Sequence, residues 1–177
     1  RVKKTSHFAR NGIHRRRGMK YHMRRSEREI TDWAVMEDIL NKGKYATIAL
    51  CRRNEPYIVT LSYGYESAAR SLYFHCAKKG LKSEFAAENP IVAATVIQDM
   101  GYIQSKCKQR YRSVVIRGEI EILTDESEKQ TAIDVLLNHL EENPDAVRAA
   151  VCEKSEPFRD MQIWKLRIKE ITGKEGE

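Results

Sequence analysis

The sequence lacks the patterns that identify several large protein classes. No apolar run approaches the roughly 18 residues that a membrane-spanning helix requires. The chain contains no G-x-G-x-x-G after a strand, no P-loop, no G-x-S-x-G and no H-E-x-x-H. Dinucleotide-fold, NTPase, hydrolase and zinc-protease interpretations therefore lack their required parts. We expect no membrane partner and no bound metal.

Cysteine is scarce and shows no paired spacing. The 177 residues include four cysteines, which are Cys51, Cys76, Cys107 and Cys152. They are far apart, and the sequence shows no recognisable secretion signal. This usage is typical of reduced thiols in the cytoplasm, which is the location we expect.

Acidic residues are absent from the first 25 positions, which carry ten lysines and arginines. The remaining residues carry 22 basic and 25 acidic side chains, so the net charge of +7 comes from this arm. Such an arm can bind nucleic acid through counterion release, but Phe8 and Tyr21 are too few aromatic residues for a stacking platform. We interpret residues 1–22 as a dispensable or added arm and residues 23–177 as one domain. Nucleic acid is the least favoured partner.

Hydrophobic patterning predicts a mainly β protein with peripheral helices. Six strands are expected at 45–51, 56–65, 71–76, 91–98, 111–123 and 161–171. A first helix begins after Thr31 or Asp32 and ends at Gly43, and a longer one begins near Asp125 and ends before Pro144. On that longer helix we expect His139 to be solvated. Six strands with mostly short connections suggest a closed or nearly closed antiparallel barrel.

The most informative segment is 71–89, in which a strand-like run ends at His75 and opens into a Lys/Gly turn. A short helix is expected to begin there, at Leu81. Lys78, Lys79 and Lys82 then surround the first turn of that helix, where amide groups and the helix dipole favour an anion. The segment predicts a phosphate site. A solvated basic turn remains the alternative.

Five segments, in this order along the chain, resemble one family. They are MRRSEREI at 23–30, PYIVTLSYGY at 56–65, LYFHCAKKGLK at 72–82, YRSVVIRGE at 111–119 and IKEITGK at 168–174. Together they are similar to the pyridoxamine 5′-phosphate oxidase-like, FMN-binding split barrels, and most similar to the nitroimidazole-resistance branch. The resemblance implies a six-stranded antiparallel split β-barrel that forms a homodimer with FMN at the interface.

The resemblance also implies roles for particular residues. Lys82 and Ser83 would bind the FMN phosphate, and Val59, Thr60, Leu61 and Ser62 would run beside the isoalloxazine. His75 and Cys76 would face the flavin or the substrate, with His75 as the candidate catalytic residue. Arg112 and Ser113 would come from the second protomer. Trp164 would form part of the cofactor wall.

Each assignment has a structural alternative. Val59 and Leu61 are of types common in a core, and Trp164 is another core candidate. His75 is equally a satisfied histidine at a strand end, because a lone histidine carries no mechanism. Arg112 fits a surface ladder with Glu119 or Glu121, two carboxylates expected on the wet side of the sheet.

The resemblance implies a flavin-dependent oxidoreductase that acts reductively on a small electron-poor acceptor of the nitro type. The runner-up is a non-catalytic module that binds flavin, deazaflavin or haem. The sequence names neither the physiological substrate nor the electron donor.

Overall fold

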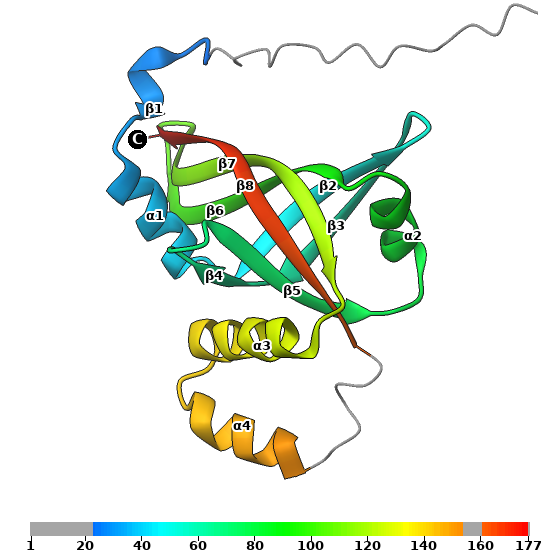
Figure 1. The fold of residues 1–177 in the computed structure, drawn as a ribbon. Coiled ribbons are helices and arrows are strands. Elements are labelled where there is room, and N and C mark those ends of the chain that lie inside the picture. The colour runs from blue at the N-terminus through cyan, green and yellow to red at the C-terminus, as the bar shows by residue number, and fades with distance from the viewer. Residues whose placement is uncertain (1–22, 154–160, 177) are drawn as a thin grey trace, which may run out of the picture.

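A computed structural model describes residues 23–153 and 161–176 of the chain, and within them a single antiparallel sheet curls into a barrel (Figure 1). Neighbouring strands follow the order β3-β2-β6-β7-β8-β5-β4, and the short β1 pairs with β8. The strands are β1 (Glu29–Ile30), β2 (Tyr45–Arg52), β3 (Glu55–Ser62), β4 (Gly64–Glu66), β5 (Ser71–Ala77), β6 (Ile91–Ile103), β7 (Lys108–Leu123) and β8 (Met161–Gly176). The predicted mainly β barrel is confirmed.

The expected strand 56–65 is interrupted at Tyr63, and this interruption closes the barrel. β3 pairs with β2, whereas β4 pairs with β5, so one nearly continuous segment joins the two ends of the sheet. Tyr63 is fully buried, and its hydroxyl donates a 2.6 Å hydrogen bond to the Leu40 carbonyl oxygen. Together with the two-residue β1, this division gives eight strands where six were expected.

The last three long strands extend further than their patterns predicted. β6 and β7 form a hairpin that continues to Ile103 and Lys108, and β8 continues to Gly176. The β7–β8 register shifts beside Gly118, where a Cβ atom would overlap the Arg167 carbonyl oxygen. Glycine is therefore needed at this close approach of two backbones.

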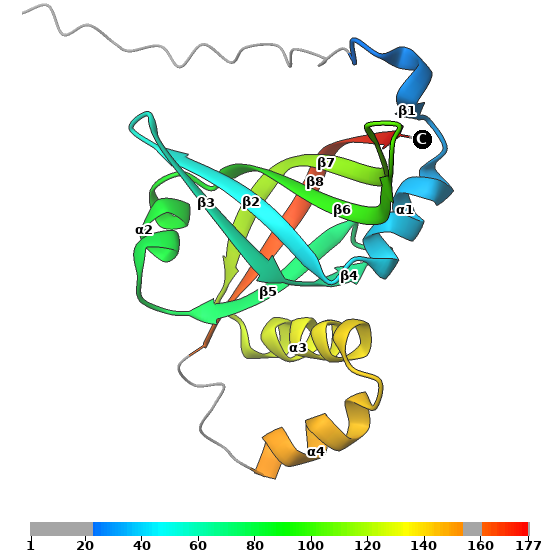
Figure 2. The same cartoon turned by 180° about the vertical axis from the view of Figure 1, so that it is seen from behind.

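The described residues include four α-helices, of which α1, α2 and α3 lie against the barrel and α4 lies beyond α3 (Figure 2). They are α1 (Trp33–Lys42), α2 (Leu81–Glu88), α3 (Glu126–Leu140) and α4 (Pro144–Glu153), and a 3₁₀ turn covers Ser26–Arg28. The side chain of Asp32 accepts a hydrogen bond from the Ala34 amide, and that of Asp125 accepts one from the Glu128 amide. Both are helix-start caps that the sequence predicted. α3 packs against β4 and β5, and α4 packs against α3.

The barrel interior and the α3 contact form two apolar clusters. The larger cluster fills the barrel and includes Trp164, Phe74 and Ile116, all fully buried. The smaller cluster joins α3 to β5 and β8 through Ile133 and Tyr73. In the part of the chain that is described, no helix is long and apolar enough to cross a membrane. The basic arm at 1–22 lies outside the described residues.

Candidate functional site

The turn between β5 and α2 is built around Gly80. Its φ of +122° lies in a region that side-chain-bearing residues rarely adopt, so this position favours glycine. The Gly80 carbonyl oxygen accepts hydrogen bonds from the amides of Ser83 and Glu84, at 3.0 and 3.2 Å. No side chain caps this helix start. The amides of Leu81 and Lys82 therefore stand at an open, positively polarised end.

The charges around this turn favour an anion. Lys78 and Lys79 are exposed in the turn, and Lys82 is half-buried on the helix. The acid in the first turn of α2, Glu84, lies 3.5 Å from the guanidinium of Arg52. That guanidinium also lies 4.3 Å from the centre of the Phe85 ring. Because Arg52 offsets its charge, Glu84 opposes an anion at the turn less than an unpaired carboxylate would.

Cys76, Lys82 and Ser83 lie close together. Cys76 is buried, and this burial raises the pKa of its thiol to about 11. The charge of Lys82 and a hydrogen bond with Ser83 oppose that rise. The Ser83 hydroxyl donates a 3.1 Å hydrogen bond to the Ala77 carbonyl oxygen, so it holds the turn against the end of β5. The structure therefore brings three of the predicted cofactor residues together and gives Ser83 a role in the fold.

His75 and Cys76 do not share a face of β5. Successive residues of a strand point to opposite sides, and here His75 is exposed while Cys76 lies in the barrel cluster. The expectation that both side chains face one ligand is therefore wrong. His75 stands opposite Ile163 of β8, on the outer surface of the sheet.

The segment 59–62 belongs to β3, which stands at one end of the strand order. β2 is its only hydrogen-bonded strand partner among the described strands, so one edge of its backbone is unpaired. Val59 and Leu61 pack against the barrel cluster. Thr60 is exposed, and its hydroxyl lies 3.0 Å from that of Thr47. Because Val59 and Leu61 turn toward the barrel, a ligand at this edge would contact mainly the unpaired backbone groups of β3.

Arg112 and Ser113 lie far from the turn within one chain. Arg112 pairs with Glu175 near the end of β8, whereas Ala77, which precedes the turn, pairs with Met161 at its start. These positions are 14 residues apart on β8, about 46 Å along an extended strand. Arg112 Nε lies 3.5 Å from Glu175 Oε2, so Arg112 forms an ion pair with Glu175 and not with Glu119 or Glu121 as suggested. The Ser113 hydroxyl donates a 3.5 Å hydrogen bond to the Lys174 carbonyl oxygen.

Trp164 is fully buried in the barrel cluster, and its indole N–H donates a 2.8 Å hydrogen bond to Gln162 Oε1. A side chain with no exposed surface cannot contact a ligand outside the barrel. The structure places Trp164 in the core, which was its alternative assignment, and we do not carry it into the proposed site.

His139, predicted to be solvated, is half-buried. Its Nε2 lies 2.6 Å from the Gly43 carbonyl oxygen, and its ring centre lies 4.9 Å from that of Tyr63. Burial lowers the pKa of His139, and the nearby charge of Lys44 lowers it further. In the sequence His139 has polar neighbours on its helix, and nothing near it in the sequence indicates the contact between α3 and the end of α1.

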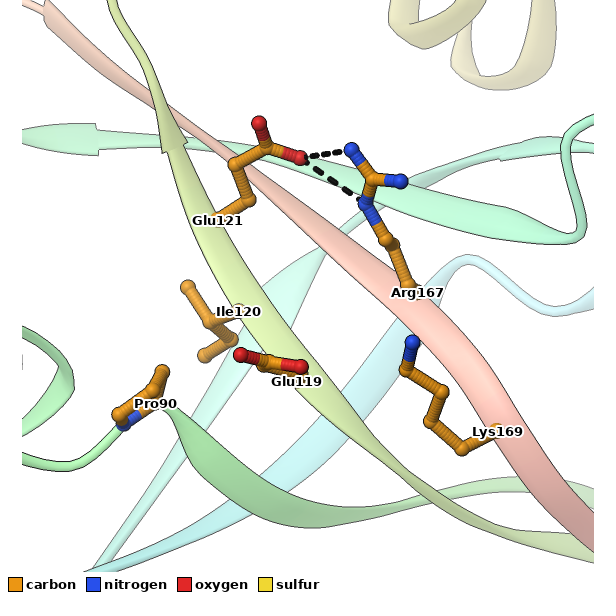
Figure 3. Close-up of a pocket in the computed structure, with 6 residues that line it drawn as sticks. All are labelled: Pro90, Glu119, Ile120, Glu121, Arg167 and Lys169. Carbon is orange, nitrogen blue, oxygen red and sulfur yellow. Dashed lines mark hydrogen bonds and ion pairs between the residues drawn. The ribbon is translucent and has the colours of Figure 1, made fainter.

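A surface pocket of about 350 Å³ lies over β7, β8 and the start of β6 (Figure 3). Its charged side chains are Glu119, Glu121, Arg167 and Lys169. Arg167 Nε donates a 2.9 Å hydrogen bond to Glu121, so part of this charge is neutralised internally. None of the predicted cofactor residues lines this pocket. Among the described residues, no cluster of histidine, cysteine and acidic side chains could hold a metal ion.

The turn and the free β3 edge fit a phosphate-bearing ring cofactor. The turn offers a half-buried ammonium and open helix amides for a phosphate, and β3 offers unpaired backbone groups for the polar rim of a flat ring. These features suit a cofactor that carries both a phosphate and a flat polar ring.

Comparison with known proteins gives one family match and many similar structures. No curated protein sequence matches the chain. A structure from Bacteroides thetaiotaomicron is 25% identical, with a TM-score of 0.68, and covers 84% of this chain and 86% of its own. Its description as a 5-nitroimidazole antibiotic resistance protein is itself provisional.

Two further structures share the fold. An FAD-binding protein from Mesorhizobium loti is 22% identical, with a TM-score of 0.62, and covers 85% of this chain and 98% of its own. The FAD and heme binding protein from Mycobacterium smegmatis is 19% identical, with a TM-score of 0.67, and covers 85% and 74%. The model of the pyridoxamine 5′-phosphate oxidase family matches residues 32–175. This protein therefore belongs to the pyridoxamine 5′-phosphate oxidase family of split barrels and resembles the nitroimidazole-resistance proteins within it.

Proposed function

We propose that this protein is an FMN-dependent oxidoreductase that reduces a small electron-poor acceptor, of the nitro type, through reduced flavin. The observation that carries the proposal is the β5–α2 turn, where Lys82 stands at an uncapped helix start in a chain of this family. The flavin, when bound, supplies the electron or hydride transfer. The protein positions it, neutralises its phosphate and shapes the space over its exposed face.

Lys82 and the first amides of α2 hold the phosphate in this proposal. The ammonium of Lys82 forms a charge-assisted hydrogen bond, and the helix end adds its positive dipole. Lys78 and Lys79 raise the positive potential at the entrance. Ser83 acts indirectly, because its hydroxyl fixes the turn against Ala77.

The ring lies along β3 in the same proposal. Backbone groups of Val59, Thr60, Leu61 and Ser62 on the unpaired edge face its polar rim. The packing of Val59 and Leu61 against the barrel cluster shields one side of this edge from water. His75, exposed near the end of β5, is the candidate for a hydrogen bond to the acceptor, since its ring nitrogens can donate or accept.

A homodimer completes the site. Arg112 and Ser113 are far from Lys82 within one chain, so in this proposal they reach a flavin site from a second copy. Alternation puts Ser113 on the exposed face of Val115 and Arg112 on the opposite side of β7. The outer face of β3, β2, β6 and β7 exposes large apolar side chains that a second copy would cover, namely Ile58, Tyr45, Ile97 and Val115. Their exposed fractions run from 43% to 65%, which is high for a surface left in water.

A cytoplasmic location is part of the proposal. Cys51, Cys76 and Cys107 are free thiols, and the first and last of them are exposed. Exposed thiols persist in reducing compartments. Recovery of the native protein in a secreted or periplasmic fraction after cell fractionation would contradict this assignment.

The second candidate is a binding module without catalytic activity. Structures with the same fold include the FAD and heme binding protein from Mycobacterium smegmatis, so flavin, deazaflavin and haem are all occupants to consider. This candidate would use the same β5–α2 turn to bind a phosphate, but it would catalyse no reaction.

An absorption spectrum of the protein purified from cells tests both candidates. The absorption bands of oxidised flavin are expected, at about one flavin per protomer. The bound flavin is then photoreduced without oxygen and mixed with a nitroimidazole. Reoxidation faster than that of free reduced FMN supports the oxidoreductase, and flavin bands without faster reoxidation support the binding module. A haem or deazaflavin spectrum overturns the FMN assignment.

A further inference from the structure

The β2–β3 hairpin holds α2 at both ends of the helix (Figure 2). At the C-terminal end, the Asn89 side chain donates a 2.7 Å hydrogen bond to the Cys51 carbonyl oxygen. Beside it, Arg53 Nε lies 2.7 Å from Glu88 Oε1. Because these contacts lie far from the first turn of α2, we expect the helix to stay docked when a contact near its start is removed.

Arg52 makes the corresponding contact near the start of α2. Leu50 is buried in the barrel, and strand alternation puts Arg52 on the same side of β2, toward the helix. Its guanidinium lies 4.3 Å from the centre of the Phe85 ring, and its Nη1 lies 3.5 Å from Glu84 Oε2. The side chain of Arg52 is only 25% exposed, so packing restricts it to this position.

Glu84 carries a negative charge in the first turn of the helix that begins after Gly80. Helical side chains lean toward the N-terminus of their helix, so a carboxylate released by Arg52 would lie over the turn that carries Lys82. There it would repel a phosphate and compete with it for the positive charge of the turn. The contact with Arg52 instead keeps this carboxylate beside the hairpin.

We propose that Arg52 is a positioning residue of the phosphate site, which acts by holding the carboxylate of Glu84 away from the bound anion. This inference rests on the proposed function, which places a flavin phosphate at Lys82. Arg52 Nε also lies 3.4 Å from Glu55 Oε2, so one cation offsets two acids and its removal would leave both without this partner. The preference for FMN over riboflavin therefore depends on Arg52 as well as on Lys82.

The affinities of FMN and riboflavin for the full chain test the inference, with quenching of flavin fluorescence as the measurement. In Arg52→Gln, FMN affinity should fall about fivefold, the upper end for loss of a single charge pair near the surface. Riboflavin lacks the phosphate, so its affinity should change by less than about twofold. The loss of FMN affinity should shrink as salt is added, because salt screens the repulsion.

A second substitution shows whether Arg52 acts through Glu84. In Glu84→Gln, and in the double variant Arg52→Gln/Glu84→Gln, FMN affinity should stay within about twofold of the wild type, because the repelling carboxylate is absent. Arg53→Gln is the matched control, since it removes the other hairpin cation, whose partner Glu88 lies in the last turn of α2. The ratio of FMN to riboflavin affinity should be unchanged in this control.

Several results would overturn the inference. A loss of FMN affinity that persists in the double variant would mean that Arg52 contacts the ligand itself or acts through the packing of the hairpin. Equal losses for FMN and riboflavin in Arg52→Gln would indicate a general defect in packing. An equal loss in Arg53→Gln would indicate a dependence on total charge, and no loss in Arg52→Gln would leave Arg52 without this role.

The proposed function is tested separately by the wild type and by Lys82→Ala. If the wild type binds no flavin, both the proposed function and this inference fail. If the wild type binds FMN and Lys82→Ala weakens that binding, the phosphate site stands, and the Arg52 variants alone decide the inference.

Discussion

The hydroxyl of Tyr63 donates a 2.6 Å hydrogen bond to the carbonyl oxygen of Leu40, and thereby ties the barrel closure to the last turn of α1. Both residues are fully buried. A carbonyl in the last turn of a helix lacks an intrahelical partner, so Tyr63 satisfies a group that water cannot reach.

Tyr63→Phe should destabilise the fold. The substitution keeps the ring in the core and leaves the Leu40 carbonyl unpaired, which costs about 1–3 kcal/mol. Urea unfolding followed by circular dichroism measures the change in the free energy of unfolding. Tyr102→Phe is the control, because Tyr102 is 50% exposed and its substitution should change that free energy by less than about 0.5 kcal/mol. Equal stability of the two variants would show that the Tyr63 hydroxyl is dispensable.

Lys82→Ala should weaken FMN binding and spare riboflavin binding. The variant loses a charge-assisted hydrogen bond to the phosphate, worth about 1.5–3 kcal/mol, which corresponds to about a tenfold to hundredfold loss of affinity. Quenching of flavin fluorescence measures both ligands. Lys79→Ala, at an exposed position of the same turn, serves as the control and should have a smaller effect. Equal losses for FMN and riboflavin would mean that Lys82 acts through folding.

Mixed dimers should recover flavin sites. If Lys82 and Arg112 serve one site from different protomers, a heterodimer of Lys82→Ala and Arg112→Ala contains one site with both lesions and one intact site. Co-purified, differently tagged chains should therefore regain about half of the wild-type high-affinity sites, as two independent sites require. Flavin titration of the heterodimer, after sedimentation has established its mass, is the measurement. No recovery, or a flavin-bound monomer, would remove Arg112 and Ser113 from the site.

Alkaline pH should destabilise the protein partly through Cys76. Burial raises the pKa of its thiol from 9.0 to about 11, so the folded state keeps a proton that the unfolded state releases. This contribution to stability is complete below pH 9 and is lost as the pH rises through about 11. Unfolding in urea between pH 8 and pH 11 should show a shallower decline for Cys76→Ala than for the wild type. Parallel declines would assign the effect to other groups, such as Tyr65, whose pKa burial raises to about 12.

Deletion of residues 1–22 should leave flavin binding unchanged. The family match begins at residue 32, and the positive charge excess is confined to the first 25 positions. Flavin occupancy and melting temperature of the full and shortened chains provide the comparison. A loss of flavin on deletion would make the arm part of the site.

Local patterns predicted the regular elements well. The alternation of 111–123 predicted β7 apart from its first three residues, and Asp32, Gly43 and Asp125 marked helix ends where the structure has them. These features depend on residues within a few positions of one another, so the sequence carries them directly.

Features that depend on distant contacts were missed. The break at Tyr63 follows from pairing with β5 and from a hydrogen bond to α1, and no neighbouring residue encodes either. His139 likewise sits among polar residues in the sequence and becomes half-buried only because α3 meets Gly43 and Tyr63.

The candidate site was predicted in part. The resemblance selected the turn at Lys82, and the turn's geometry, set by Gly80 and Ser83, agrees with an anion site. The same resemblance grouped His75 with Cys76, although strand alternation separates them, and it counted Trp164 as cofactor wall although that side chain is core. The family resemblance therefore predicted which segments lie at the site better than it predicted which way each side chain points.

β8 pairs with β5 near its start, with β7 along its length and with β1 near its end. β8 is also the last of the described strands to be synthesised, so every other strand of the barrel is made before the strand that joins them. The barrel therefore cannot form until β8 has been synthesised, and the apolar faces of the other strands stay exposed until then. This exposure favours chaperone binding, and the late non-local pairing favours slow folding. Early termination within β8 should give aggregation instead of a smaller folded domain.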